Sequence, residues 1–230
     1  MSKKRILFIH HHKHFGGATR SLYDLVYVAK KNFYVDLLTP NGPVVNFFKK
    51  LNVNLMIVTG VPKIDISFGG NYSGTRWLLL IREIYFFINF YFEFIFKKTN
   101  KDYQIIHINE FLMIPILPFI KKKFKNSKII IHLRTMITEK NNFLKKICFK
   151  IVEKNVHKII AIDKNVRNCL PDKLKKKTIV IYNPQKFEKG FIAKKKSKVL
   201  RIGFIGPINK EKGIEKLILI AKKINMKKKG

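Results

Sequence analysis

Acidic residues are scarce in this chain. Among its 230 residues, 14 Asp and Glu stand against 48 Lys and Arg, which gives a formal net charge of +34. An excess of this size favours attraction to phosphates, whether of nucleotides, lipid headgroups or nucleic acid. A compositional origin is the alternative, because Lys, Ile, Asn and Phe are all abundant, as in proteins from AT-rich genomes. Net charge alone therefore leaves the fold and the partner open.

Cysteine is also rare. The chain has two, Cys148 and Cys169, which is too few for a disulfide framework. Both lie in Lys-rich segments with a helical pattern, so we expect reduced thiols in a cytosolic protein. A secretory signal is missing as well, since the apolar residues 6–9 are too short for one and run into histidines. These features predict a cytoplasmic protein.

Two nucleotide-binding fingerprints are absent. No G-x-G-x-x-G occurs between residues 11 and 20, which argues against a dinucleotide-dependent dehydrogenase. Asp36 nevertheless remains a candidate contact to a ribose. No G-x-x-x-x-G-K-[ST] occurs either, which argues against a nucleoside triphosphatase.

The histidines do not form a metal-binding pattern. Four of them are clustered, at His10, His11, His12 and His14. Consecutive histidines at the end of a strand point in different directions, and no acidic residue follows them at ligand spacing. We therefore expect no metal site.

What the sequence does contain is a regular alternation of strand and helix patterns. Unbroken apolar runs predict strands at residues 5–10, 34–39, 54–58, 105–108, 128–133, 158–162 and 178–182. Helical patterns lie between them, at residues 18–31, 44–51, 77–96, 113–123, 142–155 and 164–170, with Asp163 as a cap for the last. This alternation predicts an α/β fold, with a doubly wound parallel sheet.

Residues 77–96 are the most apolar stretch, about long enough to cross a bilayer. Arg82, Asn89 and Glu93 fall on nearly one line of a helix, and Ile81, Ile84, Ile88, Tyr91 and Ile95 lie opposite. We favour a core helix that is buried on most sides. The alternatives are a helix lying in a membrane interface and a membrane-spanning helix.

The end of the chain has a different composition. Residues 185–198 are polar and Lys-rich, as expected of a linker. Residues 199–230 hold one strand pattern and one helix pattern, and a lone unit of this kind cannot bury both faces of its strand. We therefore expect a first domain over residues 1–184 and, over residues 199–230, the start of an incomplete second α/β domain. The alternative is that the last unit adds itself to the first domain.

Four motifs together carry a family resemblance. They are a strand followed by Gly16-Gly17-Ala18; residues 105–109; residues 158–162 followed by Tyr182-Asn183-Pro184; and residues 201–206 followed by Lys212-Gly213. In order and spacing they resemble the retaining, nucleotide-sugar-dependent glycosyltransferases of the GT-B fold, the family-4-like group. The resemblance implies a Rossmann-like N-terminal acceptor domain and the beginning of a C-terminal donor domain.

The resemblance also implies roles for particular residues. His132 resembles the catalytic cleft histidine that contacts the transferred sugar, and Arg134 and His107 would bind the acceptor. The donor phosphates would be held by Gly16, Gly17, Lys212 and Gly213. A positioned lysine suits this chemistry because charge builds up on the departing diphosphate. Taken alone, the two histidines read more simply as hydrogen-bonded core or rim residues.

Two departures from the family pattern affect the expected activity. Pro207 stands where family members usually place an arginine, and the paired glutamates of the E-x7-E motif do not occur after Lys212. On these grounds we expect a truncated enzyme that is weakly active or inactive alone. Its co-substrate would be a nucleotide sugar, with no other cofactor and no metal.

The function predicted at this point is sugar transfer from a nucleotide-sugar donor to an acceptor hydroxyl. The acceptor would be a cell-surface polysaccharide or a lipid-linked glycan, reached by peripheral contact with the inner face of the membrane. The alternative is a basic nucleic-acid- or phosphate-binding α/β protein without enzymatic activity. Charge alone supports that alternative and no recognised binding module occurs, so we expect no nucleic-acid partner.

Overall fold

The computed structural model describes residues 3–67, 72, 74–99, 101–138, 143–183, 203–205 and 213–227. By its contacts the chain divides into two units, Met1–Gln185 and Lys186–Gly230. Everything that follows concerns the first unit unless the second is named.

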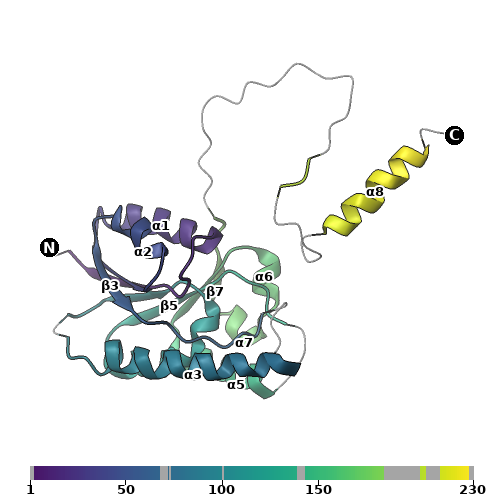
Figure 1. Cartoon of the computed structure of the whole chain (residues 1–230). Coiled ribbons are helices and arrows are strands. Elements are labelled where there is room, and N and C mark those ends of the chain that lie inside the picture. The colour runs from purple at the N-terminus through teal and green to yellow at the C-terminus, as the bar shows by residue number, and fades with distance from the viewer. Residues whose placement is uncertain are drawn as a thin grey trace. The chain divides into compact units, whose positions relative to one another are not determined.

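A seven-stranded parallel sheet forms the centre of the first unit (Figure 1). The strands are β1 (Arg5–Ile9), β2 (Tyr34–Pro40), β3 (Asn54–Val58), β4 (Ile105–Ile108), β5 (Lys128–Leu133), β6 (Lys158–Ala161) and β7 (Thr178–Val180). Their order across the sheet is β3-β2-β1-β4-β5-β6-β7, and every neighbouring pair is parallel. The predicted doubly wound α/β fold is confirmed.

Helices cover the sheet in two layers. On one face lie α1 (Gly17–Ala29) and α2 (Val44–Lys49), which appear above the sheet in Figure 1. The other face is covered by η1 (Gly74–Leu78), α3 (Leu79–Phe90), the π-helix η2 (Tyr91–Ile95), η3 (Phe111–Ile116), α4 (Leu117–Lys123), α5 (Phe143–Asn155), α6 (Lys164–Asn168) and α7 (Asp172–Lys175). Two separate hydrophobic cores result, one on each side of the sheet.

The first strand shows why its apolar run is unbroken. Successive side chains of a strand point to opposite faces, so a sheet covered on both sides needs apolar residues at every position. Leu7 and Ile9 pack into the core beneath α3–α5, while Ile6 and Phe8 pack into the core beneath α1 and α2. All four are buried.

Local helix signals also hold. Asp163 caps α6, because its carboxylate accepts a hydrogen bond from the backbone N–H of Val166 at 2.8 Å. The short helix α7, which follows Pro171, was not predicted. In the second unit, α8 (Ile214–Lys227) forms where a helix was predicted. The predicted linker, residues 185–198, lies outside the described residues.

The structure of residues 77–96 differs from the core helix, buried on most sides, that the sequence favoured. The segment is divided into η1, α3 and η2, and Glu83 is one of the two buried residues of α3. Ile81, Ile84 and Ile88 are each more than half exposed. The core-helix interpretation is therefore wrong, because the side that carries these isoleucines faces outward. None of the helices in the described residues is long and apolar enough to cross a membrane.

A buried charge lies at the amino end of the sheet. Asp36 of β2 accepts hydrogen bonds from Arg5 at 3.3 Å, from Lys101 at 2.9 Å and from the Tyr103 hydroxyl at 2.5 Å. Burial alone would raise the pKa of Asp36, but these hydrogen bonds outweigh it and hold the pKa below its usual value. Because its oxygens are engaged inside the protein, Asp36 is not available as the ribose contact considered above.

Candidate functional site

The order of the strands points to one place at the edge of the sheet. The chain builds β1, β2 and β3 in one direction and then returns to place β4 on the other side of β1. In open α/β sheets, ligands bind outside the carboxyl ends of the strands at such a switch point. The segments that meet there follow β1 and β4 and include the start of α1.

The start of α1 is unobstructed. Gly16 is the N-cap of this 13-residue helix in extended backbone, and no side chain of the described residues caps the helix. A Cβ atom added at Gly16 or Gly17 would meet no other atom within 4 Å. Packing therefore does not require glycine here, and the lack of side chains leaves the first N–H groups of α1 uncovered. These groups carry the positive end of the helix dipole.

His10 joins the end of β1 to α1. Its buried ring lies 3.1 Å from Asn109 Nδ2 through Nδ1 and 3.1 Å from Thr19 Oγ1 through Nε2. Because the amide nitrogen of Asn109 can only donate, Nδ1 accepts and Nε2 carries the proton. The Thr19 hydroxyl in turn donates to the carbonyl of His14 at 3.2 Å. Burial lowers the pKa of His10 to about 3, so the ring stays neutral and serves to position the loop.

Asn109, directly after β4, is the centre of the network. Its Nδ2 group contacts His10 and also donates to the carbonyl of Ala18 at 3.3 Å. Its backbone N–H donates to the carbonyl of Ile9 at 3.0 Å. Its Oδ1 atom accepts from Arg134. One side chain thus ties the ends of β1 and β4 to the first turn of α1.

Arg134, just after β5, uses its whole guanidinium in the same network. Nε donates to the carbonyl and Oδ1 of Asn109, both at 3.2 Å, and Nη1 donates to Ser21 Oγ at 3.0 Å and Asn183 Oδ1 at 3.2 Å. Nη2 donates to Asn109 Oδ1 at 3.0 Å and His132 Nδ1 at 3.1 Å. All five N–H groups of an arginine therefore have protein acceptors. Burial lowers the pKa of Arg134 to about 10, so it stays charged at neutral pH.

This engagement bears on the predicted role of Arg134. The side chain lies at the switch point, as a residue that contacts the acceptor should. It would nevertheless have to give up internal hydrogen bonds to grip an acceptor phosphate. Its contacts are those of a positioning residue that adds positive charge to the edge, and acceptor binding stays a prediction.

His107 and His132 lie side by side. Their ring centroids are 5.6 Å apart, and His107 also packs 5.2 Å from the ring of Phe8. Burial lowers the pKa of His107 to about 3 and that of His132 to about 2, so both rings are neutral. Because His132 accepts from Arg134 at Nδ1, its proton resides on Nε2, an atom with no hydrogen-bond partner in the described residues. His132 therefore has one N–H group without a partner in the described residues, and this group is buried.

Glu110 belongs to this edge and was missed by the sequence reasoning. Its Oε1 atom accepts from the backbone N–H of Phe111 at 2.8 Å, and Thr135 Oγ1 lies 3.4 Å from Oε2. The carboxyl is buried, which raises its pKa to about 7. An acidic residue two positions after a buried strand was the available signal. A carboxyl with this pKa can accept or release a proton near neutral pH.

Two other predicted site residues belong to the second unit. Gly213 precedes α8 with a φ of +80°, a conformation that favours glycine. Lys212 lies outside the described residues. Within the part of the chain that the structure describes, no group of three or more His, Cys, Asp and Glu side chains could hold a metal ion. The predicted nucleotide-sugar co-substrate and lack of a metal stay predictions.

Comparisons with known proteins bear on the fold. No protein-family model matches the sequence, and no curated protein matches it. Among solved structures, HepE of Anabaena in complex with UDP and glucose matches with a TM-score of 0.53 and 14% identity, over 78% of this chain and 44% of HepE. A second HepE structure, in complex with UDP-glucose, matches with a TM-score of 0.52 and 14% identity, over 78% of this chain and 43% of HepE.

CalG4, the calicheamicin glycosyltransferase, matches with a TM-score of 0.50 and 9% identity, over 80% of this chain and 53% of CalG4. The chain thus spans about half the length of these proteins, or less. HepE and CalG4 are GT-B glycosyltransferases. At identities this low the likeness shows the fold, a Rossmann-like sheet with its switch point between β1 and β4.

Proposed function

We propose that this chain is part of a glycosyltransferase that moves a sugar from a nucleotide-sugar donor to an acceptor hydroxyl. The observation that carries the proposal is the uncapped start of α1 beside the Asn109–Arg134 network. It lies at the switch point of a sheet whose structural neighbours are GT-B glycosyltransferases.

The start of α1 suits a diphosphate. Backbone N–H groups at a helix N-terminus bind anions, and the two glycines leave them uncovered. Arg134 adds a positive charge that forms no ion pair in the described residues, although the buried carboxyl of Glu110 interacts with it electrostatically. The HepE structures contain UDP and UDP-glucose, which makes a uridine nucleotide sugar the first donor to test.

The remaining roles follow the family-4-like, retaining scheme as proposals. His132, packed against the ring of His107, would contact the transferred sugar after a rearrangement that exposes its buried Nε2–H. Lys212 would stabilise the charge that builds on the departing diphosphate. The acceptor would be a glycan or a lipid-linked glycan. Residues 1–184 would hold this acceptor, and residues 199–230 would begin the donor-binding domain.

The test is the binding of UDP-glucose to the full chain, measured by ligand-observed NMR. Gly17→Val would place a branched side chain over the N–H groups of α1, and we expect at least about tenfold weaker binding, since an anion at a helix N-terminus depends on direct contact with them. Gly17→Ala should weaken binding less. Both variants should melt near the unchanged chain, because a Cβ at this position meets no atom within 4 Å.

Salt separates this proposal from the nucleic-acid alternative. Affinity for an oligonucleotide should fall steeply as salt rises, whereas a built site should keep its preference for UDP-glucose over inorganic pyrophosphate at moderate salt. Equal affinities for UDP-glucose and pyrophosphate would overturn the proposal. So would equal binding by the Gly17→Val variant.

A further inference from the structure

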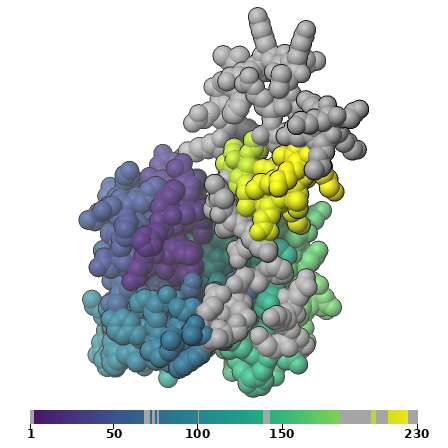
Figure 2. Space-filling model, turned by 45° about the vertical axis from the view of Figure 1, so that its right-hand side comes forward, coloured from purple at the N-terminus to yellow at the C-terminus, as the bar shows by residue number. Residues whose placement is uncertain are grey.

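The outward side of residues 77–92 is apolar. Its exposed members, which we call the apolar stripe, are Trp77 (54% exposed), Ile81 (57%), Ile84 (59%), Tyr85 (54%), Ile88 (51%) and Phe92 (63%). Their spacing places them on one side of a helix. The segment forms part of the outer surface in the space-filling view, in blue-teal at the lower left (Figure 2). A surface helix normally presents polar side chains to water, whereas here six large apolar ones are exposed as well as Arg82 and Glu93.

Specific hydrogen bonds hold this segment with its apolar stripe facing outward. Glu83 points inward and accepts from the backbone N–H of Lys63 at 3.0 Å. Glu93 accepts from the backbone N–H of Thr59 at 2.7 Å and from its hydroxyl at 2.5 Å. These bonds join both acidic residues to the segment after β3. The apolar stripe therefore faces outward because of built contacts and not because the helix is loosely attached.

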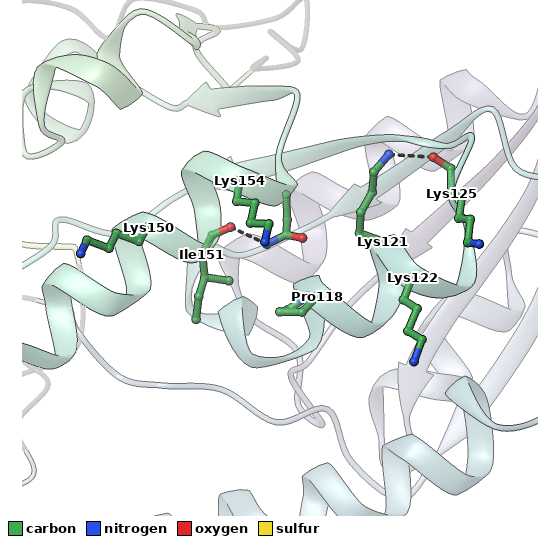
Figure 3. Close-up of a pocket in the computed structure, with 8 residues that line it drawn as sticks. Pro118, Lys121, Lys122, Lys125, Lys150, Ile151 and Lys154 are labelled. Atoms are coloured by element: carbon green, nitrogen blue, oxygen red, sulfur yellow. Dashed lines mark hydrogen bonds between the residues drawn. The ribbon is translucent and has the colours of Figure 1, made fainter.

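A basic surface lies next to the apolar stripe. Phe119 of α4 packs against the rings of Phe87 and Tyr91, with centroids 5.1 and 5.8 Å apart. On its other side, α4 and α5 border a groove of about 620 Å³. The lysines that line the groove, which we call the lysine groove, are Lys121, Lys122, Lys125, Lys150 and Lys154 (Figure 3).

Acidic side chains hardly offset this charge. Glu153 is the one acidic residue in the sequence of α4 and α5, and its carboxylate lies 3.7 Å from Lys173 Nζ. In the described residues, none of the five lysines of the groove forms an ion pair. The layer α3–α5 thus combines an exposed apolar stripe with unpaired positive charge.

We propose that this layer docks on an anionic lipid bilayer. Ile, Phe, Tyr and Trp side chains on one side of a helix suit the boundary between headgroups and acyl chains, and lysines beside them suit lipid phosphates. A second copy of the chain is a poorer partner, because its own lysine groove would repel this one. The surface is separate from the carboxyl edge of the sheet and does not depend on sugar transfer.

The test is flotation of the full chain with vesicles of phosphatidylcholine, with and without phosphatidylglycerol. We expect binding to the anionic vesicles and little to the neutral ones. The double variant Ile84→Glu, Ile88→Glu should bind at least about tenfold less, because two apolar contacts become charged ones. Its matched control is Tyr27→Glu, Val28→Glu, which changes exposed residues of α1 on the opposite side of the sheet and should bind like the unchanged chain.

A second pair of variants tests the charge. Lys122→Gln, Lys150→Gln, Lys154→Gln should weaken binding more than Lys31→Gln, Lys49→Gln, Lys50→Gln, which removes the same charge from the exposed surface of the other layer. Raising salt from about 0.1 M to about 1 M should weaken binding further, because screening shortens from about 10 Å to 3 Å. Melting temperatures report whether each variant folds.

Three results would overturn the proposal. One is equal binding to neutral and anionic vesicles. Another is an equal loss of vesicle binding in the Ile84→Glu, Ile88→Glu variant and in its control on α1, Tyr27→Glu, Val28→Glu. The third is binding to a single-stranded oligonucleotide that is tighter than binding to the vesicles and is unaffected by the Ile84→Glu, Ile88→Glu change. Such a result would make the lysine groove a nucleic-acid surface.

Discussion

The two ends of the sheet use buried charge in opposite ways. At the amino end, the negative charge of Asp36 is met by Arg5 and Lys101 and by the hydroxyl of Tyr103. At the carboxyl end, the hydrogen bonds of the Arg134 guanidinium go to neutral acceptors, of which Asn109 is the central one, and the carboxyl of Glu110, with a pKa of about 7, offsets the charge only when it is ionised. The buried charge at the amino end is therefore neutralised by opposite charges, while the carboxyl end keeps a positive charge at the switch point.

The difference separates a stabilising cluster from a candidate binding site. A buried charge with opposite charges around it contributes to stability and has little left to offer a ligand. A guanidinium among neutral groups still attracts an anion through its unpaired charge. Changes at the amino end should alter stability and leave binding unchanged, whereas changes at the carboxyl end should also alter binding.

Removing the charge at the amino end should have the largest effect. Asp36→Asn weakens the hydrogen bonds from Tyr103, Arg5 and Lys101, and we expect the free energy of unfolding to fall by about 3 kcal/mol, the upper end for hydrogen bonds to a charged group, because both cations are partly exposed and can be rehydrated. Urea denaturation measures it. Asp24→Asn, which removes an exposed pair with Arg20, is the control and should cost at most about 0.5 kcal/mol. A loss below about 1 kcal/mol for Asp36→Asn would contradict this interpretation of the amino end.

The pH dependence of stability should distinguish the two ends of the sheet, through Glu110 at the carboxyl end and Asp36 at the amino end. The pKa of Glu110 is raised from 4.5 to about 7 in the folded chain, so the folded state holds a proton that the unfolded state has lost. Stability should therefore fall as pH rises from 4.5 to 7, by on the order of 3 kcal/mol at most. Asp36 acts in the opposite sense. Its pKa is lowered, so its contribution is present above its unfolded pKa and is lost as pH falls through its folded pKa.

Denaturation of the chain at pH 5 and pH 8 measures this, with Glu110→Gln as the comparison. The variant should gain stability relative to the unchanged chain at pH 8 and lose that advantage at pH 5. An identical pH dependence for the two proteins would show that Glu110 ionises normally.

Replacing the guanidinium of Arg134 at the carboxyl end of the sheet should have the smallest effect on stability. Arg134→Lys keeps the charge but cannot reach Ser21, Asn109 and Asn183 together, so we expect a loss of about 1–2 kcal/mol. Binding of UDP-glucose should weaken as well, because the end of β4 and the start of α1 lose their common partner. Arg20→Lys, an exposed change, serves as the control. Unchanged stability and unchanged binding would remove Arg134 from the site.

The sheet was predictable because its signals are local. The apolar run of β1 and the capping of α6 by Asp163 depend on neighbours within a few residues. The network at the carboxyl edge was not predictable in the same way. Arg134 meets residues that are 25, 49 and 113 positions away in the chain, and no spacing in the sequence reports such contacts.

The helix α3 shows the same division within one element. The amphipathic pattern of residues 77–96 was visible in the sequence. The sequence did not show which side of this segment would face outward, because the partners of Glu83 and Glu93 come from the segment after β3. Lys63 donates to Glu83 and Thr59 donates to Glu93 through backbone N–H groups, which every residue type except proline supplies.

By itself, the sequence determined the seven strands of the first unit, most of the helices and the parallel character of the sheet, because apolar periodicity and turn chemistry act over short stretches of chain. Only the tertiary structure decided which charges are neutralised, which histidines are buried and neutral, and which side of α3 meets the solvent. Those outcomes depend on burial and on partners brought together from distant strand ends, and folding alone creates both.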